Sequence, residues 1–275
     1  MSQTTSSNST TEHPPTASRS AIKSIARMAE AGFENVFLFF ERQIAAHSIV
    51  GTTPIISSDG FPWASTMEDN WRQIRQELDR IMVYQEALPN FQDISVEQSA
   101  LTQDDKWKTF FLFGYGIKVE ANCSRCPRTT ELLEAIPGVT TAFFSIFGPN
   151  KQIPPHRGPW KGVVRYHLAL KVPDPASSCG IRVADETVHW SEGRGFFFDD
   201  TYDHEAWNNT SDTRVVLFLD VIRPLRFPYS EFNKAIIYLI ARTSYVRNAM
   251  KNHEAWERRF EKWLSSRGNQ NEPAS

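Results

Sequence analysis

The sequence predicts a mainly β protein with flanking α-helices, in which many short strands form an antiparallel sandwich or barrel. Short apolar or alternating segments follow one another after Lys106, and Gly, Pro and Asn residues separate them. Helical periodicity is strong only before and after this β-rich part. With 275 residues, 40% of them hydrophobic, the chain can bury one substantial core. We therefore expect a single domain over residues 20–265.

The helices are expected at the two ends of this domain. Residues 1–19 are rich in Ser, Thr, Asn and Pro and are expected to form a disordered tail. Apolar residues then recur at helical spacing over about 19–47 and about 65–88. The segment from 229 to about 265 has the same pattern, which predicts a C-terminal helix. A polar tail is expected at 266–275.

Six segments of the β-rich part are expected to be strands, with a short helix at 129–135 between the first two. In one of them, alternation places Arg165, His167 and Ala169 on one face and Val, Tyr and Leu side chains on the other. Taken alone, this polar face indicates a half-solvated strand. The strand that begins at Arg214 alternates in the same way. The six segments are 108–116, 140–147, 163–170, 180–186, 193–200 and 214–222.

Charge and cysteine content narrow the class of protein. The chain has 30 Lys and Arg against 32 Asp and Glu, a net charge of −2, so it has no general basic field that would favour nucleic acid as a partner. Three cysteines cannot all pair within one chain, and no secretory signal is recognisable at the N-terminus. A reducing cytoplasm is the expected location.

No transmembrane segment is expected, because no stretch approaches the roughly 20 apolar residues that span a bilayer. The longest apolar runs are VFLFF at 36–40 and AIIYLIA at 235–241, each bounded by charge. They are expected to be buried helix faces. Peripheral contact with the inner face of the membrane is left open.

The most informative residues are His156, His204 and Arg214. The two histidines come from separate β-rich segments and can grip a first-row metal, while Arg214 enters the next strand, where its fork can pair with a carboxylate. Singly, each has a structural explanation, since a lone histidine is more often structural than a ligand. Their joint order indicates an Fe(II)/2-oxoglutarate oxygenase. Asp200 is a candidate for orienting a metal ligand or water, although turn chemistry also explains it.

Other familiar motifs are weak or missing. Cys123 and Cys126 form a CxxC without a second pair, which gives poor support to a structural zinc site. No GxSxG, phosphate-binding loop or dinucleotide-binding motif occurs in its expected context. Ser145, within FFSIF, can donate a hydrogen bond into a barrel lumen, although most strand serines have no such role.

From Trp107 to about Pro224 the chain closely resembles the catalytic domain of the aspartyl/asparaginyl β-hydroxylase family, which includes enzymes acting on protein Asp/Asn and bacterial members that hydroxylate lipid acyl chains. Several spaced polar residues agree together with their flanks. Two further segments, 61–78 and 252–261, look like bacterial members. The matching motifs are KWKTFFLFGYG, CPRTTELLEAIPG, FFSIFGPNKQIPPHRGPWKGVVRYHLAL, WSEGRGFFFDDTYDHEAWN and RVVLFLDVIRP.

The resemblance implies a double-stranded β-helix, a jelly-roll or cupin-like fold, that uses Fe(II), 2-oxoglutarate and O2. It implies that His156 and His204 bind iron and that Arg214 holds the distal carboxylate of 2-oxoglutarate. Three further residues, Ser145, Arg165 and His167, would complete the co-substrate pocket.

Position 158 departs from the pattern of most related oxygenases. They carry an Asp or Glu two residues after the first histidine, where this chain has Gly158. The family shares this absence, which makes water or Asp200 more important to the iron. Ala169 replaces the family's usual Gly and adds a methyl group on the face expected to line the pocket.

The expected function is therefore hydroxylation of an unactivated C–H bond in an acyl chain or other small metabolite. The apolar runs at 36–40 and 235–241 are expected to form an entrance for the chain. Aspartyl or asparaginyl residues, or a free or carrier-bound amino acid, are alternative substrates. A non-catalytic metal-binding β-barrel is the alternative from another class, and a two-histidine storage or sensor domain would leave Arg165 and Arg214 unexplained.

Overall fold

The computed structural model describes residues 38–96 and 99–268. The predicted N-terminal tail and most of the first predicted helix lie outside these residues, as does the predicted C-terminal tail from 269 onward. Contacts divide the chain into residues 1–43 and 44–275. Of the first unit, the described residues 38–43 are helical.

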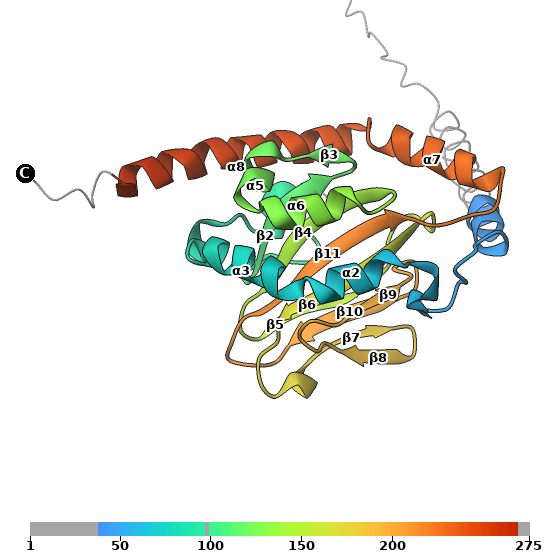
Figure 1. The fold of residues 1–275 in the computed structure, drawn as a ribbon, viewed down its shortest axis with the longest axis horizontal. Coiled ribbons are helices and arrows are strands. Elements are labelled where there is room, and N and C mark those ends of the chain that lie inside the picture. Colours follow the sequence, from blue (N-terminus) through green and yellow to red (C-terminus); the bar gives the residue numbers. More distant parts are fainter. Residues whose placement is uncertain (1–37, 97–98, 269–275) are drawn as a thin grey trace, which may run out of the picture. The chain divides into compact units, whose positions relative to one another are not determined.

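Two antiparallel sheets form the core of the second unit (Figure 1). This arrangement confirms the predicted mainly β core of jelly-roll type. The larger sheet has the order β1(Ile55–Ile56), β9(Gly195–Phe198), β6(Val163–Lys171), β11(Arg214–Ile222), β4(Val139–Phe147), β2(Trp107–Gly114), β3(Ile117–Lys118). The smaller has the order β5(Lys151–His156), β10(His204–Asn208), β7(Cys179–Val183), β8(Glu186–His189).

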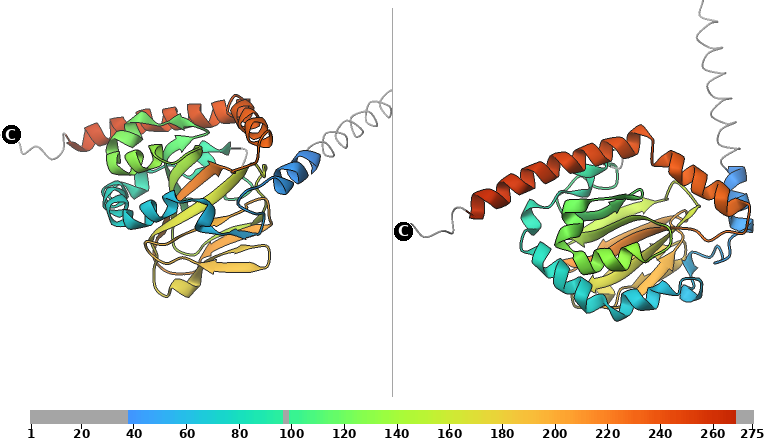
Figure 2. Two further views of the ribbon diagram at one scale, coloured as in Figure 1. Left: turned by 45° about the vertical axis from the view of Figure 1, so that its right-hand side comes forward. Right: turned by 45° about the horizontal axis from the view of Figure 1, so that its top comes forward.

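One face of the larger sheet packs against helices. The predicted alternation in β11 is confirmed, because Val215, Leu217 and Leu219 belong to the main hydrophobic core. That core also takes in residues of α2(Trp63–Asp69), α3(Trp71–Met82) and α6(Pro127–Glu134). Figure 2 shows α2 and α3 along one border of the sheet and α8(Ser244–Gly268) along another. Burial of these side chains, at about 1.5–3 kcal/mol each, anchors the helices.

The opposite face of the larger sheet is covered by the smaller sheet. Ala169 and Val216 pack there against Ile181 and Val183 of β7. The face that carries Arg165, His167 and Ala169 is therefore an interior face and not the half-solvated one that its polarity indicates. The site is built between the two sheets.

The predicted helices are divided more finely than the periodicity indicates. The segment expected as one helix at 65–88 consists of α2, α3 and the short 3-10 helix η2(Gln85–Ala87), with the first break at Asn70, whose side chain donates to the carbonyl of Thr66 at 2.8 Å. The C-terminal segment is α7(Tyr229–Ile240) followed by α8. Four further helical elements are short: η1(Ser58–Gly60), α4(Phe91–Ile94), α5(Glu120–Arg125) and η4(Ala176–Ser178).

The expectation that residues 235–241 form a buried helix face is wrong. Tyr238 and Leu239 are 57% and 64% exposed. The fully buried residue of α7 is polar: Asn233 donates to the carbonyl of Gly162 at 2.7 Å and accepts from Trp160 Nε1 at 2.9 Å. This helix is thus anchored through hydrogen bonds near its start. Within the described ranges, no helix is long and apolar enough to cross a membrane.

Candidate functional site

The two histidines meet at one end of the smaller sheet. His156 ends β5 and His204 begins β10; the two are paired in register and their ring centroids are 4.1 Å apart. Neither β5 nor β10 was among the strands expected from the sequence. Pro154 and Pro155 obscure β5, which is tolerated because β5 is an edge strand.

The hydrogen bonds of both rings fit a metal ligand. Nδ1 of His156 lies 2.8 Å from the carbonyl oxygen of Pro154, and Nδ1 of His204 lies 2.9 Å from that of Tyr202. A carbonyl oxygen only accepts, so each Nδ1 donates and each Nε2 keeps its lone pair. Burial lowers the pKa of His156, and burial with nearby positive charge lowers that of His204 to about 3. Both rings are thus neutral at neutral pH, as metal ligands must be.

A third, acidic residue lies beside the histidines. Asp200 is buried, and Arg165 Nη2 lies 2.9 Å from its Oδ2. Neither carboxylate oxygen accepts a hydrogen bond of normal geometry from the described residues, so this contact is an ion pair that leaves acceptor capacity free. Burial raises the pKa of Asp200 to about 6, against the opposing effect of Arg165. The described ranges contain no cluster of three or more His, Cys, Asp or Glu side chains suited to a metal.

Gly158 leaves the space that Asp200 occupies. Its backbone N–H donates to the Asp200 carbonyl at 2.6 Å, and a Cβ on residue 158 would lie 2.0 Å from Asp200 Oδ2. The carboxylate of Asp200 can therefore be buried at this place only because residue 158 has no side chain.

The guanidinium of Arg165 lies between two carboxylates. Its Nε and Nη2 donate to the two oxygens of Asp220 at 2.8 and 3.1 Å, and Nη2 also faces Asp200. Its guanidinium stacks over Phe218 at 4.3 Å. Sequence reasoning missed Asp220, whose pairing follows from the register of β6 with β11.

Arg214 is a buried cation without a counter-charge among the described residues. It is 1% exposed, and its Nε and Nη1 have no hydrogen-bond partner there. Its guanidinium lies 3.8 Å from the ring centre of Phe147 and 4.3 Å from that of Trp190. Burial lowers its pKa to about 9. Because a buried unpaired charge costs several kcal/mol, this arrangement fits a bound anion with two oxygens.

His167 and Ser145 line the same interior. His167 is 7% exposed, and neither of its ring nitrogens has a partner in the part of the chain that the structure describes. Ser145 Oγ accepts from Trp107 Nε1 at 3.1 Å. The structure thus places both residues between the sheets. The aromatic residues Trp107, Phe147 and Trp190 were missed, because aromatic residues in strands carry no signal of a site.

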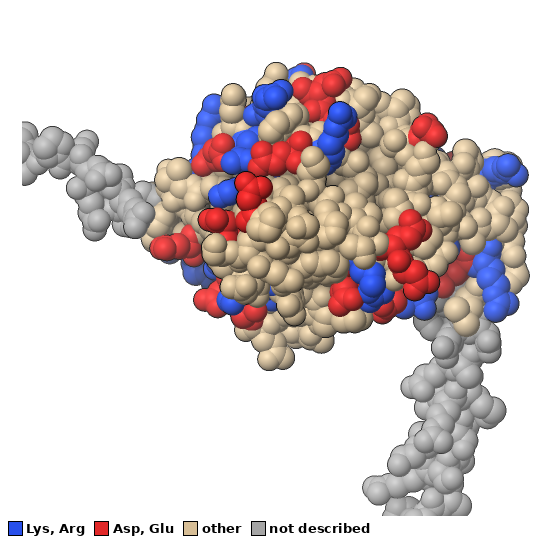
Figure 3. Space-filling view, turned by 90° about the horizontal axis from the view of Figure 1, so that it is seen from below, with Lys and Arg blue, Asp and Glu red and all other residues tan. Residues whose placement is uncertain are grey.

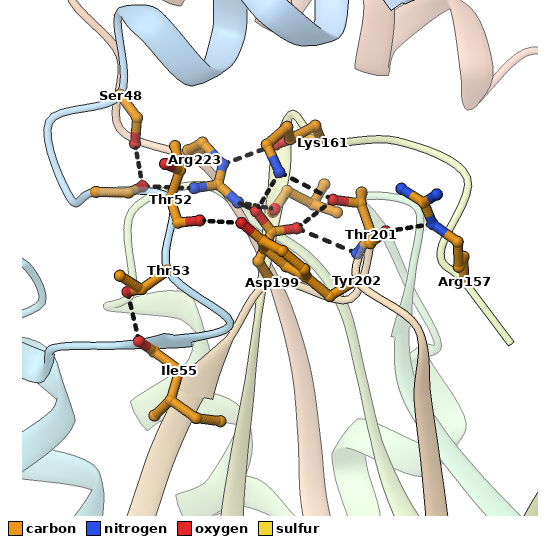
Figure 4. Close-up of polar contacts among 12 residues, drawn as sticks. Ser48, Thr52, Thr53, Ile55, Arg157, Lys161, Asp199, Thr201, Tyr202 and Arg223 are labelled. Atoms are coloured by element: carbon orange, nitrogen blue, oxygen red, sulfur yellow. Dashed lines mark hydrogen bonds and ion pairs between the residues drawn. The ribbon is translucent and has the colours of Figure 1, made fainter. Parts of the chain in front are cut away.

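A buried polar network holds the two histidine loops together (Figure 4). Asp199 Oδ2 accepts from Lys161 and Arg223, each at 2.7 Å, and Oδ1 accepts from Thr201. Burial by itself raises the pKa of Asp199, but the two cations outweigh burial and bring this pKa below its usual value. Tyr202 donates from its hydroxyl to the carbonyl of Thr52 at 2.7 Å. The segments after His156 and before His204 are therefore fastened to each other and to the chain near residue 52.

A cavity of about 390 Å³ leads away from these residues. Its lining includes His156, Arg157, Gly158, Arg165, Asp200 and Asp220. Much of the remaining lining is apolar and includes Phe91, Ile94, Leu101, Phe111, Phe143, Ala249 and Met250. Residues 235–241 do not line it, so the entrance expected from that run is wrong; helix α8 provides the wall instead.

Comparison with known proteins places the chain in a family. The family model described as aspartyl/asparaginyl beta-hydroxylase matches residues 68–224. An ornithine lipid ester-linked acyl 2-hydroxylase from Rhizobium tropici is 43% identical over 228 residues, covering 83% of this chain and 81% of that protein. The human aspartyl/asparaginyl beta-hydroxylase is 34% identical over 164 residues, which cover 58% of this chain and 21% of that protein.

Solved structures match at low identity. The Cupin_2 domain of an XRE family transcriptional regulator from Enterobacter cloacae has a TM-score of 0.30 and 13% identity, covering 43% of this chain and 99% of that one. The family match spans both histidine strands and Arg214. The chain belongs to the aspartyl/asparaginyl β-hydroxylase family.

Proposed function

We propose that the protein is an Fe(II)- and 2-oxoglutarate-dependent oxygenase that hydroxylates an acyl chain. The observation that carries the proposal is Arg214, a buried cation whose Nε and Nη1 have no partner among the described residues. It lies on the same interior as two histidines whose Nε2 atoms are available. A scaffold without ligands would gain nothing from such a costly charge. The family relationship supports hydroxylation as the reaction class.

Each residue has a role in this proposal. His156 and His204 hold Fe(II) through Nε2, and Arg214 pairs bidentately with the distal carboxylate of 2-oxoglutarate. Ser145, His167 and Arg165 complete the co-substrate pocket, and Asp200 orients a ligand in a remaining position with its free acceptor oxygens. When bound, iron, 2-oxoglutarate and O2 supply the oxidising chemistry that converts C–H to C–OH and releases succinate and CO2. The sandwich excludes bulk water and fixes the orientation of the groups.

The cavity favours an acyl chain over the alternative substrates. Much of its lining consists of Phe, Ile, Leu and Met side chains, which match a hydrocarbon chain. The relative from Rhizobium tropici is named for the same kind of substrate. Aspartyl or asparaginyl residues and free amino acids remain the competing substrates in the screen.

Arg214→Gln is expected to weaken anaerobic binding of 2-oxoglutarate to the iron-loaded protein by about a hundredfold, since two charge-assisted hydrogen bonds are lost. Arg214→Lys keeps the charge but not the fork, and should lose about tenfold or more. Arg182→Gln is the matched control, because Arg182 pairs with Asp203 and Glu205 outside the cavity. Binding measured by titration, followed by detection of succinate on admission of O2, checks the result.

Unchanged affinity in Arg214→Gln, or no 2-oxoglutarate binding by folded iron-loaded wild-type protein, would remove the co-substrate assignment. A non-catalytic metal-binding β-barrel would then be the better description.

We also propose a cytoplasmic location with peripheral contact between α7 and an anionic membrane surface. Phe227, Tyr238 and Leu239 are 82%, 57% and 64% exposed. Residues 226–251 contain five Lys and Arg but one Glu, whereas charges of both signs are interspersed on the face in Figure 3. Apolar side chains flanked by cations suit the interface of an anionic bilayer.

The double variant Phe227→Ser/Leu239→Ser is expected to lower binding to vesicles containing anionic lipid by about tenfold or more, since two apolar side chains lose their burial in the bilayer. Val83→Ser is the control, because Val83 is 73% exposed but lies at the end of α3. Co-sedimentation with vesicles measures both. Equal binding by the double variant and wild type would rule out this surface.

A further inference from the structure

The turn between β2 and β3 carries a residue in an unfavourable conformation. Gly114 pairs with Ile117, so the turn has two central residues, Tyr115 and Gly116, with φ of 52° and 82°. Positive φ at both central positions is the pattern of a type I′ turn, which favours Asn, Asp or Gly. An aromatic residue at the first position is strained, and such strain concentrates at functional sites.

The side chain of Tyr115 reaches the cavity. Tyr115 lines it together with Tyr245 of α8, and the two rings meet edge to face with centroids 5.8 Å apart. A backbone hydrogen bond holds the turn in place, because Gly116 N–H donates to the carbonyl of Thr140 at 2.6 Å. The strained backbone thus carries an aromatic side chain that lines the substrate space.

Tyr115 belongs to a row of hydroxyls from three separate elements. Tyr245 Oη lies 2.9 Å from Ser95 Oγ, and the ring of Tyr115 meets the ring of Tyr245 edge to face. Burial, first of all, and then the neighbouring Tyr245 raise the pKa of Tyr115, so its hydroxyl stays protonated and neutral. A tyrosine hydroxyl donates one hydrogen bond and accepts others, so the row can present a donor to a carbonyl oxygen.

The position of the row selects the kind of group it meets. Tyr115, Tyr245 and Ser95 line the same cavity as Arg165 and Asp220, whose charges act on Tyr115. Because Arg165 is held by two carboxylates, the cation beside the row is already neutralised. A neutral donor beside a balanced ion pair suits a neutral carbonyl better than a carboxylate.

We propose that Tyr115 is a substrate-positioning residue whose hydroxyl binds the ester or amide carbonyl of the acyl substrate and so fixes which carbon faces His156 and Asp200. This inference rests on the proposed acyl-chain function. It explains why the turn keeps a tyrosine where Asn or Gly would be less strained.

The test compares two ligands in the metal-free protein: a medium-chain acyl ester of an amino acid, and the matched alkyl ether that lacks the carbonyl oxygen. Wild type is expected to bind the ester about three- to tenfold more tightly, the worth of one neutral hydrogen bond. Tyr115→Phe should reduce this preference to within about twofold while keeping the ring. Tyr84→Phe, at a tyrosine that does not line the cavity, should leave it unchanged.

A purely structural role for the hydroxyl would show as lost stability. We expect the melting temperature of Tyr115→Phe to stay within about 2 °C of wild type, and that of Tyr115→Asn to stay level or rise by about 1–3 °C as the turn relaxes. With iron, 2-oxoglutarate and O2, Tyr115→Phe should also spread hydroxylation over neighbouring carbons and form more succinate per hydroxylated product.

The outcomes separate the inference from the proposed function. An unchanged ester preference in Tyr115→Phe, or no preference in wild type, overturns the role of Tyr115 even if succinate is formed. A preference that depends on Tyr115 in a protein that binds no 2-oxoglutarate supports the positioning role and overturns the oxygenase.

Discussion

Replacement of His204 by alanine is expected to abolish iron-dependent binding of 2-oxoglutarate, with metal affinity lowered by at least about a hundredfold. The reason is the small number of protein ligands. In the proposed site two histidines hold the metal through Nε2, so each variant removes half of the protein's hold on the metal. His156→Ala should have the same effect. Titration with Fe(II) or Co(II) under anaerobic conditions, followed by 2-oxoglutarate, measures both steps.

A matched control separates ligation from packing. His189 donates from Nδ1 to the carbonyl of Cys179 at 2.8 Å, as the two site histidines do to their own carbonyls, but it lies in β8, at the far edge of the smaller sheet. His189→Ala should keep metal affinity within about twofold. If His204→Ala still bound metal like wild type while folded, the two-histidine site would be wrong.

The strands that form the walls of the site were predictable, because their alternation is strong. The bounds of β11 agree with the segment expected from the sequence, since Val and Leu at alternate positions have no helical interpretation. The same alternation placed Arg165 and His167 on the face opposite the core. It could not show that a second sheet covers that face, because the residues of β7 that pack there are remote in sequence.

The residues that complete the site depend on register and on helix packing. Asp220 meets Arg165 because β6 and β11 pair at that position, and no local pattern reports such a register. Part of the apolar lining of the cavity comes from α4 and α8, outside the β-rich part. The run at 235–241 was expected to be buried because hydropathy alone does not reveal that α7 is held by Asn233. Contacts between segments that are distant in the sequence decided each of these points.

Gly158→Asp is expected to damage the site even though it introduces the carboxylate that most related oxygenases carry there. Even a methyl group at position 158 would overlap Asp200, whose Oδ2 would lie 2.0 Å from the new Cβ. Gly158→Ala should therefore displace Asp200 and the loop that carries His204, and lower 2-oxoglutarate turnover by about a hundredfold or more, since misplacement of about 1 Å can cost that much. Gly148→Ala is the control, because Gly148 does not line the cavity and the atoms nearest its new Cβ would be those of Lys106, at 3.5 Å or more.

Removing Asp200 at the same time should reverse the damage. In Gly158→Asp/Asp200→Ala the space next to His156 is cleared, and the carboxylate of residue 158 can enter it. We expect this double variant to bind Fe(II) at least about tenfold more tightly than Gly158→Asp alone, with a higher melting temperature. If the effects of the two substitutions on Fe(II) affinity are instead additive, residue 158 and Asp200 do not compete for the same space. The compact Gly158 would then have to be explained by the backbone alone, through the 2.6 Å hydrogen bond from its N–H to the carbonyl of Asp200.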